Sequence, residues 1–426
     1  MEPATLRVKI SDRLRLLALP IPALFVLDGL ANALDFAFYF WLGRSLIPSD
    51  FAVLQTLNVV ILVYVTASGV FQPVISRFVA EARGRGDESS VPGIFLTFLR
   101  PSVALALALG ILVFAFSGAL AGLFNLPAWS IQISAAVICL STLRPVAAGV
   151  LQGRENFIPF GFTRLAQASA RIILAVVLVR AGLGLLGAVL ALPFGWLVSV
   201  VCAFLLLGRA TWRRDGSPPD GILRRGWALS AYALVAYFAF MSLTGLDLVW
   251  VNRNLSGQLA GAYSTLVLMR RIIALLPGVA VLVMYPRIAK SLAEGRSPDR
   301  LLAQTAAVIL AAGGALTLLY FTLGDQLITL VFGRGYRAAA PLLGWMGLAM
   351  VGVSLAAIWL SYYLAEKPRG FVLLLAAAVG LEWLLLNLLP ASLAGATLAF
   401  GVTGWLLALG GLLLYLFKSR ARVPHA

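Results

Sequence analysis

The chain has 426 residues, of which 61% are hydrophobic and only 12% are charged, and its mean hydropathy is +0.96. A water-soluble protein of this length cannot bury so much apolar surface. Stretches of about 20 apolar residues, long enough to cross about 30 Å of hydrocarbon, recur along the chain. The formal net charge of +16 then reflects the orientation of the loops and not a nucleic-acid partner.

We predict an all-α polytopic membrane protein with about twelve transmembrane helices, because a membrane β-barrel needs alternating segments of about ten residues instead. In chain order the spans are expected at residues 16–42, 51–75, 96–120, 130–151, 157–179, 183–208, 227–251, 259–285, 301–323, 339–364, 370–390 and 393–417. Basic residues before the first span resemble a signal peptide. The length of that span and its two aspartates, Asp28 and Asp35, favour a retained helix.

The distribution of basic residues predicts the orientation in the membrane. With an even number of spans, both termini lie on one side. The termini and the loops on that side, loop edges included, hold 25 of the 33 Lys and Arg residues, and the opposite loops hold five. The side richer in Lys and Arg is normally cytoplasmic, so both termini are expected in the cytoplasm of a multi-pass protein in the bacterial cell membrane.

A polar stretch near the centre of the chain, RATWRRDGSPPDGILRRG at residues 209–226, has the composition of a linker. We therefore expect an N-terminal six-helix lobe at 1–208, a cytoplasmic linker at 209–226 and a C-terminal six-helix lobe at 227–426. Residues 42–57 align without gaps with residues 251–266, 209 positions later. Two further similarities follow in the same order, which indicates a parallel internal repeat, as in two-lobed transporters that bind substrate in a central cavity.

Several strings together resemble the polysaccharide transporter branch of the MOP superfamily, the Wzx-type flippases. They are WLGRSLIPSDFAVLQTL, PVISRFVAEARGRGD, GVLQGRENF, LAGAYSTL, MYPRIAKSLAEG and LVFGRGYRAAAPLLGWMGLAM, in this order. One departure is Ala52, where the first half of the family pattern commonly has Gly; the second half keeps it as Gly261. The resemblance implies two six-helix lobes that move a polyprenyl-diphosphate-linked oligosaccharide across the membrane by alternating access. It makes that lipid, membrane lipids and polysaccharide assembly machinery the expected partners, in lipopolysaccharide or exopolysaccharide biosynthesis.

Two adjacent arginines, Arg270 and Arg271, lie about 15 residues from the end of their span, roughly 22 Å deep at 1.5 Å per residue. Their repeat partners are Ile61 and Leu62, so the charge is specific to one half. A guanidinium matches phosphate oxygens, and we expect Arg270 or Arg271 to bind the carrier diphosphate. The alternative is an ion pair with an intramembrane carboxylate.

Four carboxylates in the expected spans are candidate coupling or cavity residues: Asp28, Asp35, Asp247 and Glu382. Such residues often bind a coupling proton or sodium ion in transporters, although balancing the charge of the arginines is the alternative. Arg171 is expected in the cavity or in the scaffold. The sequence shows no catalytic constellation and no metal-ligand spacing, so we expect neither enzymatic activity nor a cofactor.

Three other functions remain open on the sequence. A peptidoglycan lipid-precursor flippase handles a similar lipid diphosphate but typically has fourteen spans. A multidrug exporter of the same superfamily favours a negative cavity for cationic drugs. A membrane glycosyltransferase or polymerase needs carboxylates or metal ligands on a substantial outer loop, and the outer loops here are short.

Overall fold

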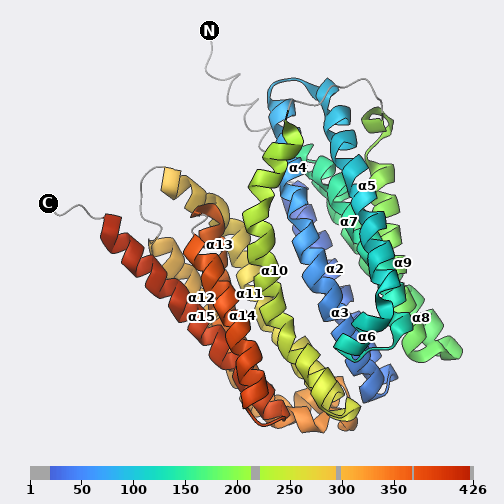
Figure 1. The fold of residues 1–426 in the computed structure, drawn as a ribbon, viewed down its shortest axis with the longest axis vertical. Coiled ribbons are helices and arrows are strands. Elements are labelled where there is room, and N and C mark those ends of the chain that lie inside the picture. Colours follow the sequence, from blue (N-terminus) through green and yellow to red (C-terminus); the bar gives the residue numbers. More distant parts are fainter. Residues whose placement is uncertain (1–19, 213–220, 294–298, 367–368, 423–426) are drawn as a thin grey trace. The chain divides into compact units, whose positions relative to one another are not determined.

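The computed structural model describes residues 20–212, 221–293, 299–366 and 369–422, and every regular element in them is helical. The α-helices are α2 (Pro20–Ser45), α3 (Pro48–Gly69), α4 (Phe71–Gly84), α5 (Val91–Ala115), α6 (Ser117–Phe124), α7 (Ala128–Gly153), α8 (Phe157–Leu178), α9 (Gly184–Leu206), α10 (Ile222–Asn254), α11 (Gly257–Ala293), α12 (Asp299–Val331), α13 (Leu343–Glu366), α14 (Arg369–Leu388) and α15 (Leu393–Arg422) (Figure 1). Short elements are η1 (Glu88–Ser90), η2 (Val179–Leu183), η3 (Arg209–Trp212) and η4 (Arg334–Leu342). The chain start at 1–19 and residues 213–220 of the expected linker lie outside the described residues.

The long helices agree with the expected spans. Among the described residues, ten helical segments are long and apolar enough to cross a membrane. One of them, Phe157–Leu206, contains both α8 and α9. They are joined by η2, in which Gly182 has a φ of +91° that interrupts the helical conformation. Since no lipid-exposed backbone group can remain unpaired in hydrocarbon, helices are the expected solution for such a chain. The prediction of an all-α membrane protein with about twelve long helices is confirmed.

Three expected spans are each divided in the structure. The span at 51–75 ends as α3 at Gly69, and α4 begins at Phe71. The span at 96–120 consists of α5 and the short α6, which closes on Asn125 in the left-handed conformation. The span at 339–364 begins with the 3-10 turns of η4 before α13. Hydropathy alone does not locate these breaks, because the residues on both sides of each break are apolar.

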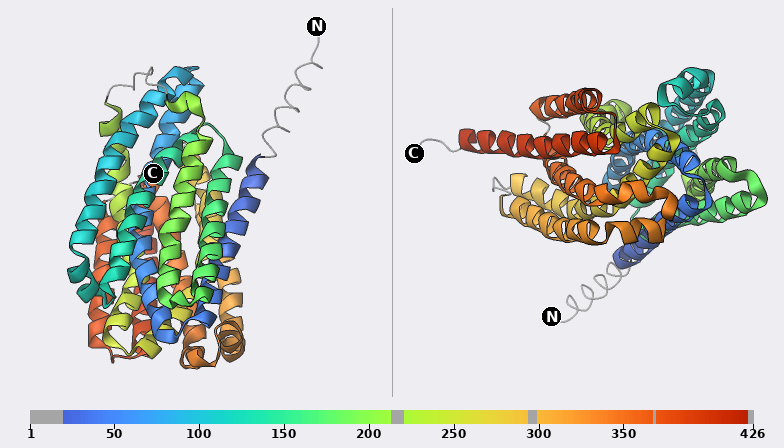
Figure 2. Two further views of the ribbon diagram at one scale, coloured as in Figure 1. Left: turned by 90° about the vertical axis from the view of Figure 1, so that its right-hand side faces the viewer. Right: turned by 90° about the horizontal axis from the view of Figure 1, so that it is seen from below.

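Contacts divide the chain into two units, the first of residues 1–42 and 68–231 and the second of residues 43–67 and 232–426. In the first unit α5, α7 and α9 lie side by side (Figure 2). Apolar side chains of α4, α5 and α7 form its core, among them Ile75, Phe95 and Val150. Gly149 lets α7 approach α4, since a Cβ there would lie 2.9 Å from the carbonyl oxygen of Gln72.

The second unit contains most of α3, which we expected in the N-terminal lobe. Close backbone contact explains the difference: a Cβ on Gly261 of α11 would lie only 2.2 Å from the carbonyl oxygen of Pro48, at the start of α3. Phe51 of α3 also packs edge-on against Tyr336 of η4, with ring centroids 5.9 Å apart. Residues 43–67 therefore belong by their contacts to the second unit, and the other boundary between the units falls after residue 231.

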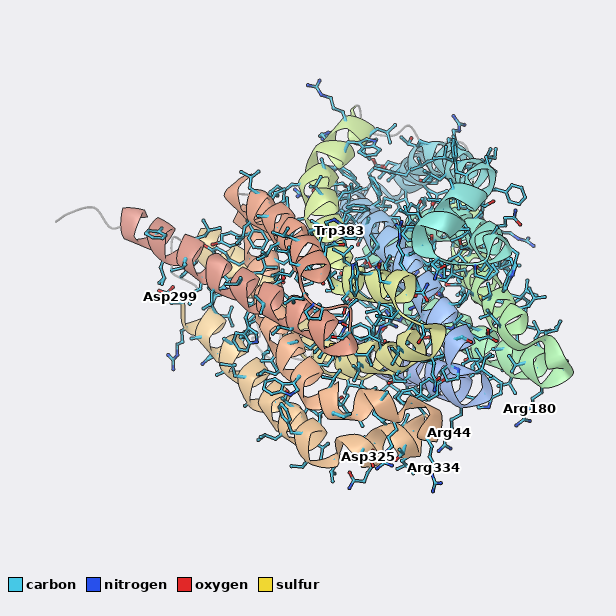
Figure 3. All side chains as sticks on the ribbon, turned by 60° about the horizontal axis from the view of Figure 1, so that its bottom comes forward. Arg44, Arg180, Asp299, Asp325, Arg334 and Trp383 are labelled. Carbon is cyan, nitrogen blue, oxygen red and sulfur yellow. The ribbon has the colours of Figure 1, made fainter. Side chains whose placement is uncertain are left out.

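Polar contacts hold the segment between α12 and α13 at one end of the second unit, where Arg44, Asp325 and Arg334 lie (Figure 3). Arg44 donates a hydrogen bond to the carbonyl oxygen of Leu330. Arg337 binds both carboxylate oxygens of Asp325, at 2.8 and 3.2 Å. Both side chains of that pair are exposed, so the pair contributes little to stability.

The helix boundaries agree with the repeat expected from the sequence. Helix α2 ends at Ser45 and α10 ends at Asn254, while α3 begins at Pro48 and α11 at Gly257. Both pairs of positions are separated by the 209 residues of the sequence alignment. The turn between the first two long helices of each half is thus built in the same register.

Candidate functional site: two charged clusters inside the helices

Arg270 forms a buried ion pair with Asp247 in the second unit. Helices α11 and α10 bring the two side chains together, and their exposed fractions are 3% and 0%. One guanidinium nitrogen of Arg270 bonds Asp247 Oδ2. The other donates to Asp247 Oδ1 at 3.1 Å and to the carbonyl oxygen of Thr244 at 2.6 Å. Asp247, which we expected to be a coupling or cavity residue, thus neutralises Arg270, which we expected to bind the substrate.

Two aromatic residues complete the surroundings of this pair. Tyr263 donates a hydrogen bond from its hydroxyl to Asp247 Oδ2 at 2.8 Å. The guanidinium carbon of Arg270 lies 3.9 Å from the ring centroid of Phe400, a cation–π geometry that further stabilises a desolvated charge. Arg271, the next residue on α11, is half-buried. The ion pair that the sequence left open for Arg270 is therefore present in this structure.

Glu382 of α14 is fully buried near the same pair. Neither of its carboxyl oxygens has a hydrogen-bond partner among the described residues, and its exposed fraction is 0%. It lies within electrostatic range of Asp247 and Arg270, yet the guanidinium of Arg270 is directed to Asp247 and Thr244. An unpaired buried carboxylate is costly, so this cluster of one arginine and two carboxyl groups needs a further cation or a proton for neutrality.

Two ion pairs join α2 and α8 in the first unit. Asp28 pairs with Arg164, with Nε and Oδ1 3.2 Å apart, and Asp35 pairs with Arg171, with Nη2 and Oδ1 2.5 Å apart. The two aspartates of α2 are seven residues apart, and so are the two arginines of α8. Each pair therefore lies on one face of its helix, two turns apart. Asp28 and Asp35 thus balance arginines in this structure, which was the alternative to a coupling role.

Arg171 is held more tightly than Arg164. Its guanidinium carbon lies 4.3 Å from the ring centroid of Phe38, and its side chain is 11% exposed. A Cβ on Gly195 of α9 would lie 2.9 Å from the Cβ of Arg171, so the glycine lets the two helices pack closely. These contacts fit the scaffold alternative for Arg171.

Two arginines of the charged cluster in the first unit, Arg144 and Arg164, were not predicted as site residues. Arg164 and Arg144 were included with the basic residues of the cytoplasmic loop edges, but they lie inside α8 and α7. Arg164 follows the start of its helix by seven residues, about 10 Å. A signal for Arg164 exists in the sequence, because Asp28 and Asp35 are separated by seven residues and so are Arg164 and Arg171.

The two clusters differ in their charge. In the second unit, Arg270 faces two carboxyl groups, Asp247 and Glu382. In the first unit, three arginines on α7 and α8 face two aspartates on α2. Within the described residues no group of three or more His, Cys, Asp or Glu is arranged to hold a metal ion. Both clusters thus place ionisable side chains within membrane-spanning helices, where such residues are rare and commonly functional in transporters.

Comparison with solved structures identifies the fold. An inward-facing multidrug resistance MATE family transporter of the MOP superfamily aligns with a TM-score of 0.79 and 13% identity, over 92% of this chain and 95% of that chain. A MATE structure in the straight conformation aligns with a TM-score of 0.63 and 15% identity, over 95% of each chain. A eukaryotic MATE transporter, AtDTX14, gives 0.63 and 13%, over 93% of this chain and 95% of that one. At such identities the likeness shows a MATE-like fold and no more.

Comparison of sequences adds the family. Residues 21–292, well over half of the chain, match the family described as "Polysaccharide biosynthesis protein". A comparison with curated proteins gave no match.

Proposed function

The chain belongs to the polysaccharide biosynthesis protein family, and we propose that it translocates a polyprenyl-diphosphate-linked oligosaccharide, a polysaccharide or O-antigen repeat unit, across the cytoplasmic membrane. The observation that carries the proposal is the combination of this family with a MATE-like transporter fold over nearly the whole chain. A membrane transporter in polysaccharide biosynthesis needs a substrate made inside the cell and used outside, and a lipid-linked oligosaccharide is such a substrate.

The positive charge inside the helices supports a substrate that contains a diphosphate. Arg270 and Arg271 on α11, and Arg144 and Arg164 in the first unit, place guanidinium groups within membrane-spanning segments. Such residues are costly in hydrocarbon and usually serve a function. We assign the diphosphate contact to Arg271 and to Arg270, the latter once its pair with Asp247 opens.

Coupling to a proton or sodium ion belongs to the same proposal. Of the four candidate carboxylates, Glu382 has the strongest support, because it is buried, has no hydrogen-bond partner within the described part of the chain, and lies beside a pair that is already neutral. Asp28, Asp35 and Asp247 each have an arginine partner. We therefore place the coupling ion at Glu382. Alternating access moves the diphosphate head outward while the lipid tail stays in the bilayer, with both termini in the cytoplasm.

Export of a multidrug substrate is the second candidate, because the similar solved structures are MATE transporters. The first unit opposes it, since three arginines against two aspartates give a local excess of positive charge that repels cationic drugs.

A cellular test separates the two candidates. The gene is expressed in bacteria whose own exporter of lipid-linked repeat units has been deleted, and surface polymer is measured beside the minimum inhibitory concentrations of cationic drugs. The proposal expects restored polymer and unchanged drug resistance. Raised resistance without polymer would favour the multidrug exporter. The host must make the matching repeat unit, so strains with several different repeat units are compared.

A further inference from the structure

Arg144 carries a positive charge that has no ion-pair partner among the described residues of the first unit. Its Nε donates a hydrogen bond to the Ser199 hydroxyl of α9 at 3.0 Å, and its side chain is half-buried. Among the described residues no carboxylate lies within 4.0 Å of its guanidinium. A guanidinium has five N–H donors. Among the described residues, only one N–H group of Arg144 has a protein acceptor, the Ser199 hydroxyl.

The nearest charges show that the excess belongs to a cluster. Arg144 interacts electrostatically with Arg164, which repels it, and with Asp28, which attracts it. Asp28 is already paired with Arg164 at 3.2 Å. Asn32 links these two, because it accepts a hydrogen bond from Arg164 at 2.6 Å and donates one to Asp28 at 3.3 Å. Two guanidinium groups therefore share one carboxylate, which leaves one net positive charge.

The cluster is accessible and lies at a consistent depth. The side chains of Arg164 and Asp28 are each 44% exposed, so a ligand can approach them. Arg144 precedes the end of α7 at Gly153 by nine residues, and Arg164 follows the start of α8 at Phe157 by seven. At 1.5 Å per residue these distances are about 14 and about 10 Å. The expected topology places both of these helix ends, Gly153 of α7 and Phe157 of α8, on the cytoplasmic side of the membrane.

We propose that Arg144 and Arg164 form a binding site for a phosphate oxyanion in the half of the first unit that is expected to face the cytoplasm. A tetrahedral oxyanion offers several acceptors to the free N–H groups of Arg144, in the geometry that guanidinium groups prefer. Asp28 keeps Arg164 oriented and limits the excess charge while the site is empty. If the chain translocates a lipid diphosphate as proposed above, this site holds that diphosphate as it arrives from the cytoplasm, before Arg270 and Arg271 bind it.

Binding of inorganic pyrophosphate to the purified full-length protein tests the site. The protein is placed in nanodiscs of phosphatidylcholine, and dissociation constants are measured by isothermal titration calorimetry. We expect Arg144→Gln to weaken binding about 10-fold or more, since a charge-assisted hydrogen bond is lost. Arg144→Lys should retain part of the affinity. Asp28→Asn should tighten binding, because it raises the local excess of positive charge.

The control is Arg337→Gln, which removes an exposed, ion-paired arginine far along the chain from this cluster and should leave binding unchanged. Size-exclusion profiles and melting temperatures identify any variant that is misfolded. Equal pyrophosphate affinity in wild-type protein, Arg144→Gln and Asp28→Asn would overturn the proposal, as would equal losses in Arg144→Gln and Arg337→Gln.

Nanodiscs that contain phosphatidylglycerol distinguish the two sources of the phosphate. If phospholipid headgroups occupy the site, phosphatidylglycerol competes with pyrophosphate in the wild type, and the competition disappears in Arg144→Gln. If the site discriminates in favour of a diphosphate, the wild-type affinity is the same in both lipids. Polymer export is measured separately. Failure of the wild type to restore export refutes the proposed function and leaves the pyrophosphate result standing, whereas restored export with unaltered binding in Arg144→Gln refutes the site.

Discussion

Tyr263 donates its hydroxyl hydrogen bond to the same carboxylate oxygen of Asp247 that Arg270 binds, at a donor–acceptor distance of 2.8 Å. Both residues of this bond are fully buried. The bond fixes the Asp247 carboxylate in place for Arg270 and supplies an additional donor to it. The Asp247 carboxylate is therefore well placed to bind a cation, and in this structure that cation is the guanidinium of Arg270.

Removing one member of the Arg270–Asp247 pair should destabilise the protein strongly. We expect Arg270→Met to cost about 3–5 kcal/mol, because it leaves the buried carboxylate of Asp247 without its cation. Asp247→Asn should cost less, because the carboxyl group of Glu382 remains near Arg270. The double variant should cost clearly less than the sum. Thermal melting of purified protein in detergent measures these effects. The matched control is the exposed pair, with Arg337→Met and Asp325→Asn, for which less than about 1 kcal/mol is expected. Additive losses at the buried pair would contradict the assignment.

Replacing Glu382 with Gln should affect coupling and leave the fold intact. Gln has nearly the same shape and needs no counter-ion, so the melting temperature should be unchanged or higher. If Glu382 holds the driving proton or sodium ion, transport by the variant should no longer respond to a pH or sodium gradient imposed across liposomes. Glu81→Gln, which alters an exposed pair with Arg77, is the control. An undiminished response in Glu382→Gln would remove this residue from the coupling role.

Gly261→Ala should be far more harmful than an alanine elsewhere in a helix. The new Cβ would lie 2.2 Å from the carbonyl oxygen of Pro48, so the backbone of α3 or α11 must move. Gly314 of α12 has no atom within 4 Å of the equivalent position, and alanine there should stabilise the helix by up to about 1 kcal/mol. Opposite shifts in melting temperature for the two variants are the expected result, and similar shifts would contradict the close approach of α3 and α11.

Cysteine labelling tests the orientation. In a variant without the native Cys139 and Cys202, single cysteines at the exposed positions Ala128 and Ala391 should react with a membrane-impermeant maleimide in intact cells. A cysteine at Ser89, also exposed, should react only after the membrane is permeabilised. The reverse pattern would invert the topology, and the proposed direction of transport with it.

Sequence reasoning succeeded where one physical quantity decides the structure. The length of an apolar run determines whether a helix spans the membrane, and each of the twelve expected spans contains a long helix, although three of them also include a second helical element. The 209-residue shift of the sequence alignment likewise agrees with the helix boundaries, because α2 and α10 end 209 positions apart and α3 and α11 begin 209 positions apart.

Sequence reasoning was weaker for the charged clusters, whose pairing depends on the rotation and depth of each helix. Arg164 was placed at a loop edge because its helix starts only seven residues earlier. Whether Arg270 faces a ligand or Asp247 depends on how α10 and α11 pack, which hydropathy does not encode. The grouping of α3 with the second unit depends in the same way on tertiary contact at Gly261.

A transport assay with the purified protein shows whether this chain moves a lipid-linked oligosaccharide between leaflets. The full-length chain is reconstituted in liposomes that contain a polyprenyl-diphosphate oligosaccharide with a fluorescent sugar, and a membrane-impermeant quencher added outside reports the fraction in the outer leaflet. We expect quenching to proceed to nearly the whole population in proteoliposomes, and replacing both Arg270 and Arg271 with Lys should slow it at a comparable amount of incorporated protein. Quenching that stops at the outer-leaflet fraction, as in liposomes without protein, would contradict the account.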